Sequence, residues 1–250
     1  MIAANSITTV PRILVVDDEQ DTCANLQDIL GELGYHVDTA NDGLSALDLV
    51  AKQPYDVALL DLKMPGMDGL ELYRRIKARR ADTVAIVVTA YATSETAKAA
   101  LDAGAWQVLS KPVDFSQLLK LVNEATEQPL VLIVDDDREL CETLWDLFRE
   151  RNCRVSLAHD PTQAKAQLAE QRFEVVLIDM KLPGASGRDI FHLVRDANPE
   201  ARTILITGMR SEMDQLISKT LEEGADAACY KPFDVAKLLA VVERLTGRGK

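Results

Sequence analysis

Residues 12–30, RILVVDDEQDTCANLQDIL, indicate the architecture of the chain, because a similar segment, LVLIVDDDRELCETLWDLF, follows at residues 130–148. In both copies a continuous apolar run is followed by acidic residues and then by an amphipathic segment. This pattern is typical of a buried parallel strand that leads into a helix. Two further segments match in the same way, YDVALLDLKMPGMDGLEL at residues 55–72 and FEVVLIDMKLPGASGRDI at residues 173–190. The chain therefore contains the same structural unit twice.

The repeat predicts two domains. The offset between the copies is 118 residues through the first three motifs and 120 at the last, so the second copy carries two additional residues before its final motif. We expect the first domain to span residues 1–128, with a core that starts at about residue 12, and the second to span residues 129–250. Pro129 marks the junction, because proline ends a helix and favours an extended residue before it.

Within each copy, five short apolar runs alternate with helical patterns. Runs such as ILVV, VALL and AIVV are apolar at every position, as expected for strands that are covered on both faces. Strands that alternate with helices form parallel sheets with right-handed crossovers. The predicted fold class is α/β, with two doubly wound (βα)5 domains in tandem, each built on a parallel five-stranded sheet.

Composition narrows the function classes. The chain has 250 residues with 40 acidic against 28 basic side chains, a net charge of −12, which argues against direct binding of nucleic acid. Neither a secretory signal nor an apolar segment of membrane-spanning length is present, so we expect a cytoplasmic protein that does not contact membranes. The four cysteines lack the spacing of a metal or redox site and are expected to be buried thiols.

Polar residues follow the apolar runs, at points that a parallel sheet brings to one edge, where ligands bind. Three carboxylates at one edge repel one another unless a cation lies among them, and a set of oxygen ligands favours Mg²⁺, with Mn²⁺ or Ca²⁺ as alternatives. A nearby lysine and hydroxyl suit a phosphoryl group, which a carboxylate can attack. The residues are Asp17, Asp18, Asp61, Thr89 and Lys111 in the first copy and Asp135, Asp136, Asp179, Thr207 and Lys231 in the second.

These motifs resemble the receiver domain of response regulators in two-component signalling, over about residues 12–128 and 129–247. The resemblance implies a flavodoxin-like fold and a protein that catalyses only its own phosphorylation and dephosphorylation. It also implies a partner, either a histidine kinase or a histidine phosphotransfer protein. Formation of a homodimer is an open possibility.

The resemblance assigns roles to paired residues, one in each copy. The implied phosphoacceptors are Asp61 and Asp179. The implied Mg²⁺ ligands are the acceptors themselves, Asp18 and Asp136 directly, Asp17 and Asp135 through water, and the backbone carbonyls of Lys63 and Lys181. The residues that would contact the phosphoryl group are Thr89, Lys111, Thr207 and Lys231. The Lys-Pro bonds at Pro112 and Pro232 are expected to be cis.

Two departures from the family pattern affect signalling. Val108 and Ala228 stand where receivers often carry an aromatic reporter of phosphorylation, so transmission by that route is in doubt in both copies. Lysines follow both acceptors by two residues, and Tyr91 and Met209 follow the threonines by two. These side chains cannot activate a water molecule, and they crowd its approach to the phosphoryl group. The phosphorylated aspartates are therefore expected to hydrolyse slowly.

Two alternative functions share features with this pattern. A phosphatase of the haloacid dehalogenase type needs a D-x-D motif after its first strand, whereas the nucleophile candidate here follows the third strand. The chain could instead be the receiver portion of a larger protein, such as a hybrid histidine kinase or a diguanylate cyclase. No residues remain after about residue 247 for an output domain, so the sequence itself offers no support for that alternative.

Overall fold

The computed structural model describes residues 10–208 and 210–247, and only the backbone at residues 210–213. The chain divides into two compact units between Glu127 and Gln128, one residue before the expected junction. Each unit contains a parallel five-stranded sheet with alternating helices, as the sequence predicts.

The first unit has the strand order β2-β1-β3-β4-β5, all parallel. The order reverses between β1 and β3, so the carboxyl ends of these two strands flank the position where doubly wound sheets bind ligands. Its elements are β1 (Arg12–Val16), α1 (Gln20–Glu32), β2 (His36–Ala40), α2 (Gly43–Lys52), β3 (Val57–Leu60), α3 (Gly69–Arg79), β4 (Val84–Thr89), α4 (Ser94–Asp102), β5 (Gln107–Ser110) and α5 (Phe115–Thr126).

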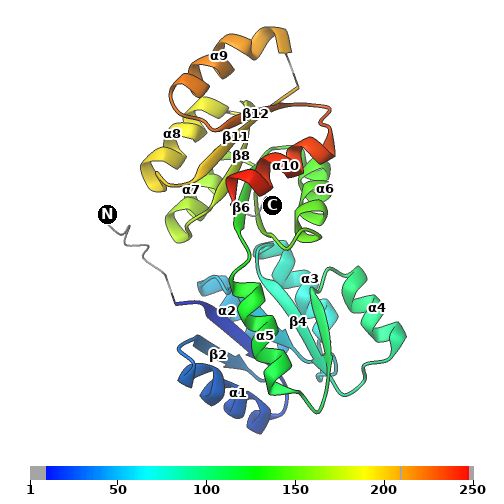
Figure 1. Cartoon of the computed structure of the whole chain (residues 1–250). Coiled ribbons are helices and arrows are strands. Elements are labelled where there is room, and N and C mark those ends of the chain that lie inside the picture. Colours follow the sequence, from blue (N-terminus) through cyan, green and yellow to red (C-terminus); the bar gives the residue numbers. More distant parts are fainter. Residues whose placement is uncertain (1–9, 209, 248–250) are drawn as a thin grey trace. The chain divides into compact units, whose positions relative to one another are not determined.

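Both faces of this sheet are covered (Figure 1), which explains the uninterrupted apolar runs. Successive residues of a strand point to opposite faces. Leu14 and Val16 of β1 pack on the face covered by α2, α3 and α4, whereas Ile13 and Val15 pack on the face covered by α1 and α5. The sheet therefore holds its carboxyl edge between two apolar layers.

The second unit repeats this arrangement in the order β12-β11-β8-β6-β7. In Figure 1, α7, α8 and α9 lie on one side of its sheet and α6 and α10 on the other. Its elements are β6 (Leu130–Val134), α6 (Arg138–Arg149), β7 (Arg154–Ala158), α7 (Pro161–Glu170), β8 (Val175–Asp179), β9 (Lys181–Leu182), β10 (Ala185–Ser186), α8 (Gly187–Ala197), β11 (Arg202–Thr207), α9 (Arg210–Glu222), β12 (Ala227–Tyr230) and α10 (Val235–Leu245).

The units differ after the acceptor strand and in the segment before the last strand. In the second unit, β9 and β10 form a small antiparallel pair after the acceptor strand, which the sequence pattern does not predict. Strands of two residues are too short to leave a periodic signal. The two additional residues of the second copy fall in the segment that contains α9, which has 13 residues where α4 has 9.

Within residues 10–208 and 210–247, no helix is both long enough and apolar enough to cross a membrane.

Candidate functional site

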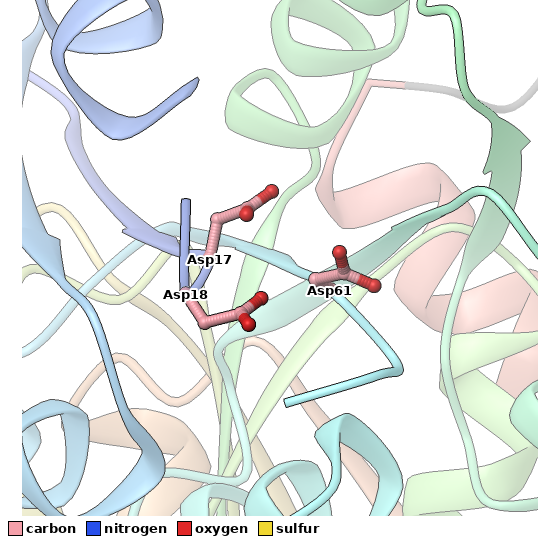
Figure 2. Close-up of side chains that lie close together, drawn as sticks. All are labelled: Asp17, Asp18 and Asp61. Atoms are coloured by element: carbon pink, nitrogen blue, oxygen red, sulfur yellow. The ribbon is translucent and has the colours of Figure 1, made fainter. Parts of the chain in front are cut away.

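The carboxyl edge of the first sheet brings the predicted acidic residues together. Asp17 and Asp18 directly follow β1, and Asp61 directly follows β3 (Figure 2). One carboxylate oxygen from each lies within 4.8 Å of the others. Asp17 and Asp61 are buried, whereas Asp18 is exposed. The cluster therefore has two buried walls and one side that opens to solvent.

Lys111 neutralises the two buried carboxylates. Its Nζ donates to Asp17 Oδ2 and to Asp61 Oδ2, each at 2.6 Å. The backbone N–H of Lys111 donates to the carbonyl of Thr89 at 2.9 Å, and the Lys111–Pro112 bond is cis, as the resemblance implies. Burial alone would lower the pKa of Lys111, but its hydrogen bonds to the carboxylates outweigh this effect and the pKa is raised.

Backbone groups fix the remaining carboxylate oxygens of the first site. The N–H of Glu19 donates to Asp17 Oδ1 and the N–H of Lys63 donates to Asp61 Oδ1, both at 3.0 Å. The buried thiol of Cys23 donates to the Asp17 carbonyl at 3.4 Å. The sequence predicts only a buried thiol at Cys23, although its place one turn into the helix after the acidic pair is a signal of contact with that pair.

The second unit contains a closely similar site. The Lys231 Nζ lies 2.6 Å from Asp135 Oδ2 and 2.6 Å from Asp179 Oδ2, and the Lys231–Pro232 bond is cis. The N–H of Lys181 donates to Asp179 Oδ1 at 2.9 Å, and the Cys141 thiol donates to the Asp135 carbonyl at 3.3 Å. The same contacts therefore arise twice from two sequences that differ at most other positions.

An open pocket of about 480 Å³ joins the second site's residues. Its lining includes every side chain that the sequence predicts for this copy: Asp135, Asp136, Asp179, Lys181, Thr207 and Lys231. Asp135 is fully buried, and desolvation raises the pKa of its carboxyl despite the hydrogen bond from Lys231. In the first unit, Asp17, Asp61 and Lys111 line a pocket of about 270 Å³ that extends over the start of α1.

The threonines complete the edge. Thr89 is buried at the end of β4, and its Oγ1 accepts a hydrogen bond from the Tyr91 N–H at 3.1 Å. Thr207 is buried at the end of β11. Tyr91 is 58% exposed, and the Lys63 Nζ lies 5.6 Å from its ring centroid, a cation–π distance. Met209, the counterpart of Tyr91, lies outside the described residues.

Val108 and Ala228, which stand in place of the usual aromatic reporter, pack against the cores of their units. Val108 packs against the apolar layer beneath α2 and α3, and Ala228 packs against the corresponding layer of the second unit. Tyr230, two residues after Ala228, reaches Asp214 of α9 through its hydroxyl at 3.4 Å.

The donor set of each cluster fits a hard divalent cation. Each cluster consists of three carboxylates, and no sulfur or imidazole among the described residues belongs to either one; oxygen-only sets suit Mg²⁺, Mn²⁺ or Ca²⁺. The exposed aspartate leaves each cluster open to water and to an incoming oxyanion. The arrangement can therefore hold a cation and a phosphoryl group next to a buried carboxylate.

Comparison with known proteins gives one consistent result. The family model for the response regulator receiver domain matches residues 13–123 and again residues 131–243. A response regulator receiver protein of Anaeromyxobacter sp. (strain Fw109-5) is 32% identical over 234 residues, which cover 94% of each chain. The transcriptional regulatory protein ZraR of Klebsiella oxytoca is 42% identical over 113 residues, which cover 45% of this chain and 26% of that protein.

Several solved structures match about half of this chain. The signal receiver domain of an HD domain-containing protein from Pseudomonas fluorescens Pf-5 is 31% identical, with a TM-score of 0.48, and the match covers 50% of this chain and 93% of that one.

Proposed function

We propose that this chain accepts phosphoryl groups on Asp61 and Asp179 from phosphohistidine on a partner protein. The chain belongs to the response regulator receiver domain family, with one domain in each half. Receiver domains are non-catalytic modules of two-component phosphorelay signalling, and they receive phosphoryl groups from histidine kinases or phosphotransfer proteins. The partner in this proposal is a histidine kinase or a phosphotransfer protein. Phosphorylation changes the conformation of the chain, and that change transmits the signal.

The observation that carries the proposal is the duplicated lysine bridge. In each unit one ammonium lies 2.6 Å from two buried carboxylates, beside a third carboxylate that is exposed. A bridge with a structural role alone would leave the exposed aspartate unexplained, because Asp18 and Asp136 add repulsion without burial. A site that recruits a cation and a phosphoryl group needs that third carboxylate.

Mg²⁺, or Mn²⁺ in its place, fits this donor set. In the first unit Asp18, Asp61 and the Lys63 carbonyl would hold the ion, with Asp17 acting through water. In the second unit the corresponding ligands are Asp136, Asp179 and the Lys181 carbonyl, with Asp135 acting through water. When bound, the ion supplies positive charge against the phosphoryl oxygens.

The chain's own residues account for the transfer. A carboxylate oxygen of Asp61 attacks the phosphorus, a P–O bond forms as the P–N bond to histidine breaks, and the imidazole leaves with the electron pair. The Lys111 ammonium then leaves Asp61 Oδ2 and contacts a phosphoryl oxygen. The Thr89 hydroxyl contacts a second phosphoryl oxygen after its loop shifts. Asp179, Lys231 and Thr207 play the same parts in the second unit.

Phosphoryl loading tests this function. Treatment of the full chain with acetyl phosphate and Mg²⁺ should give singly and doubly modified protein by intact-mass spectrometry, and chelation of the ion should abolish both products. Asp61→Asn should remove one addition and Asp179→Asn the other, because each amide keeps the shape of the carboxylate without its nucleophilic charge. Additions that persist in the double variant, or none in the unmodified chain, would contradict the proposal.

A further inference from the structure

The first residue of α3 touches the backbone of the acceptor. Gly69 begins this helix directly after its N-cap Asp68, and its N–H donates to the carbonyl of Leu62 at 3.1 Å. A Cβ at Gly69 would lie 2.2 Å from the Asp61 carbonyl oxygen, 2.9 Å from its carbonyl carbon and 3.0 Å from the Leu62 Cα. A Cβ atom essentially never lies closer than 3.0 Å to a backbone atom outside its own neighbourhood, so only glycine fits this contact.

The second unit contains the same contact. Gly187 begins α8, and its N–H donates to the Met180 carbonyl at 3.2 Å. A Cβ there would lie 2.5 Å from the Met180 Cα and 2.6 Å from the Asp179 carbonyl oxygen. Neither Gly69 nor Gly187 has a positive φ. The requirement is therefore space between helix and acceptor, and not an unusual backbone conformation.

Neither side of the contact can move away freely. On the helix side, Leu72 and Ile76 of α3 are fully buried in the core. On the acceptor side, Leu62 and Met64 are buried in the same cluster. Close packing on both sides transmits a displacement instead of absorbing it. An added methyl group would therefore displace the main chain at Asp61 itself, because the packed residues on either side cannot absorb it.

We propose that Gly69 and Gly187 are positioning residues for phosphoryl transfer, which hold the acceptor carboxylates of Asp61 and Asp179 in reacting position by letting α3 and α8 lie against the acceptor backbone. This inference rests on the proposed function, because it concerns the same two acceptors. The helix start acts through the acceptor's main chain and touches neither the phosphoryl group nor the donor.

The expected effect follows from the overlap. A methyl group at Gly69 must retreat from 2.2 Å to beyond 3.0 Å, which displaces the Asp61 backbone by roughly 1 Å, and misplacement of that size slows a positioned reaction by about 100-fold. It also separates the Asp61 carboxylate from the Lys63 N–H and the Lys111 ammonium, which now hold its two oxygens. Gly69→Ala should therefore lower the rate constant of loading, and not only its extent.

The experiment follows loading of the 250-residue chain over time at saturating acetyl phosphate and Mg²⁺, with each acceptor resolved by peptide mass spectrometry. Gly69→Ala should slow loading of Asp61 by about 100-fold and leave Asp179 at its normal rate in the same molecules. Gly187→Ala should show the reverse selectivity. The second acceptor is thus an internal control for donor, ion and protein quality.

One matched variant in the first unit controls for the glycine-to-alanine change itself. Gly31 in α1 has nothing within 4 Å of an added Cβ, so Gly31→Ala should load both sites normally.

Two results would overturn the inference, and a third would overturn the proposed function. Loading of Asp61 in Gly69→Ala at the normal rate constant would do so, whether complete or with a reduced amplitude, because a role in folding alone lowers the loaded fraction and leaves the rate of folded molecules unchanged. Loss of the near-UV circular dichroism of the first unit would also overturn it, since the glycine would then be a folding requirement. Failure of the unmodified chain to load either acceptor would instead contradict the proposed function.

Discussion

Replacement of Lys111 by methionine should destabilise the first unit in the absence of divalent cations. Methionine keeps much of the side chain's length but removes the ammonium that lies 2.6 Å from Asp17 and from Asp61. Removal of one partner from a buried ion pair costs about 3–5 kcal/mol. The Lys111 side chain is 20% exposed, so water reaches part of the cluster and we expect a loss of about 2 kcal/mol in the free energy of unfolding.

Urea unfolding can measure this loss in one unit at a time, because the chain has two tryptophans and each unit contains one of them, Trp106 and Trp145. In a Trp145→Phe background, fluorescence reports on the first unit alone. With a urea dependence of 1–3 kcal/mol per molar, the midpoint should fall by roughly 1 M. Added Mg²⁺ should raise the midpoint more in the Lys111→Met variant than in its parent, since the ion no longer competes with the ammonium.

The chain offers a matched lysine as a control. Lys120 is 74% exposed and lies 3.8 Å from Glu124, so Lys120→Met should change the free energy of unfolding by no more than about 0.5 kcal/mol. Equal effects of the Lys111 and Lys120 changes, or a Lys111→Met midpoint that stays in place without Mg²⁺, would refute the claim that the ammonium neutralises the buried carboxylates.

Three further predictions concern other groups in the first unit. Desolvation by burial is the main cause that raises the pKa of Tyr55 from 10.0 to about 12, so its neutral form contributes stability that is complete below pH 10 and lost between pH 10 and 12. Urea unfolding at a series of pH values should therefore show a shallower alkaline decline for Tyr55→Phe, and parallel curves would contradict this. Lys63→Asn with Tyr91→Glu should accelerate phosphoryl loss from Asp61 by about tenfold or more, because the pair can orient and activate water. Mass spectra taken after removal of the donor measure the decay, and loss within seconds in the unmodified chain would rule out a slow-decaying protein. Asp18→Ala should abolish Mg²⁺-dependent loading of Asp61 and spare the second acceptor, whereas loss at both would mean that the two sites are coupled.

Tyr55 has a natural control in the second unit, because Phe173 occupies the corresponding position and is equally buried. The second unit should therefore lack the Tyr55 contribution to the alkaline decline. Fluorescence of Trp145 in a Trp106→Phe background can follow it separately.

The sequence predicts the fold and the membership of each cluster because both depend on signals that a sequence carries directly. Apolar runs specify strands buried on both faces, and the polar residues that end those runs must meet at the carboxyl edge of a parallel sheet. That reasoning brings Asp17, Asp61 and Lys111 together across nearly 100 residues, as the structure has them.

The contacts within each cluster could not be predicted in the same way. The bridge from Lys111 to both carboxylates depends on side-chain reach at a turn with a cis peptide bond, and residue type alone does not report that reach. The fit of Gly69 against Asp61 depends on the distance between a helix and a strand end. The hydrophobic periodicity of the sequence carries no information on that distance. Both are products of tertiary packing.

Whether Asp61 and Asp179 are the acceptors can be tested by identifying the residues that receive phosphate from a phosphorylated histidine kinase or phosphotransfer protein. Hydride reduction converts an aspartyl phosphate into homoserine, which tandem mass spectrometry locates in the chain. We expect homoserine at Asp61 and at Asp179 and at no other aspartate. Modification of a different residue, or transfer that persists when both acceptors are changed to asparagine, would contradict it.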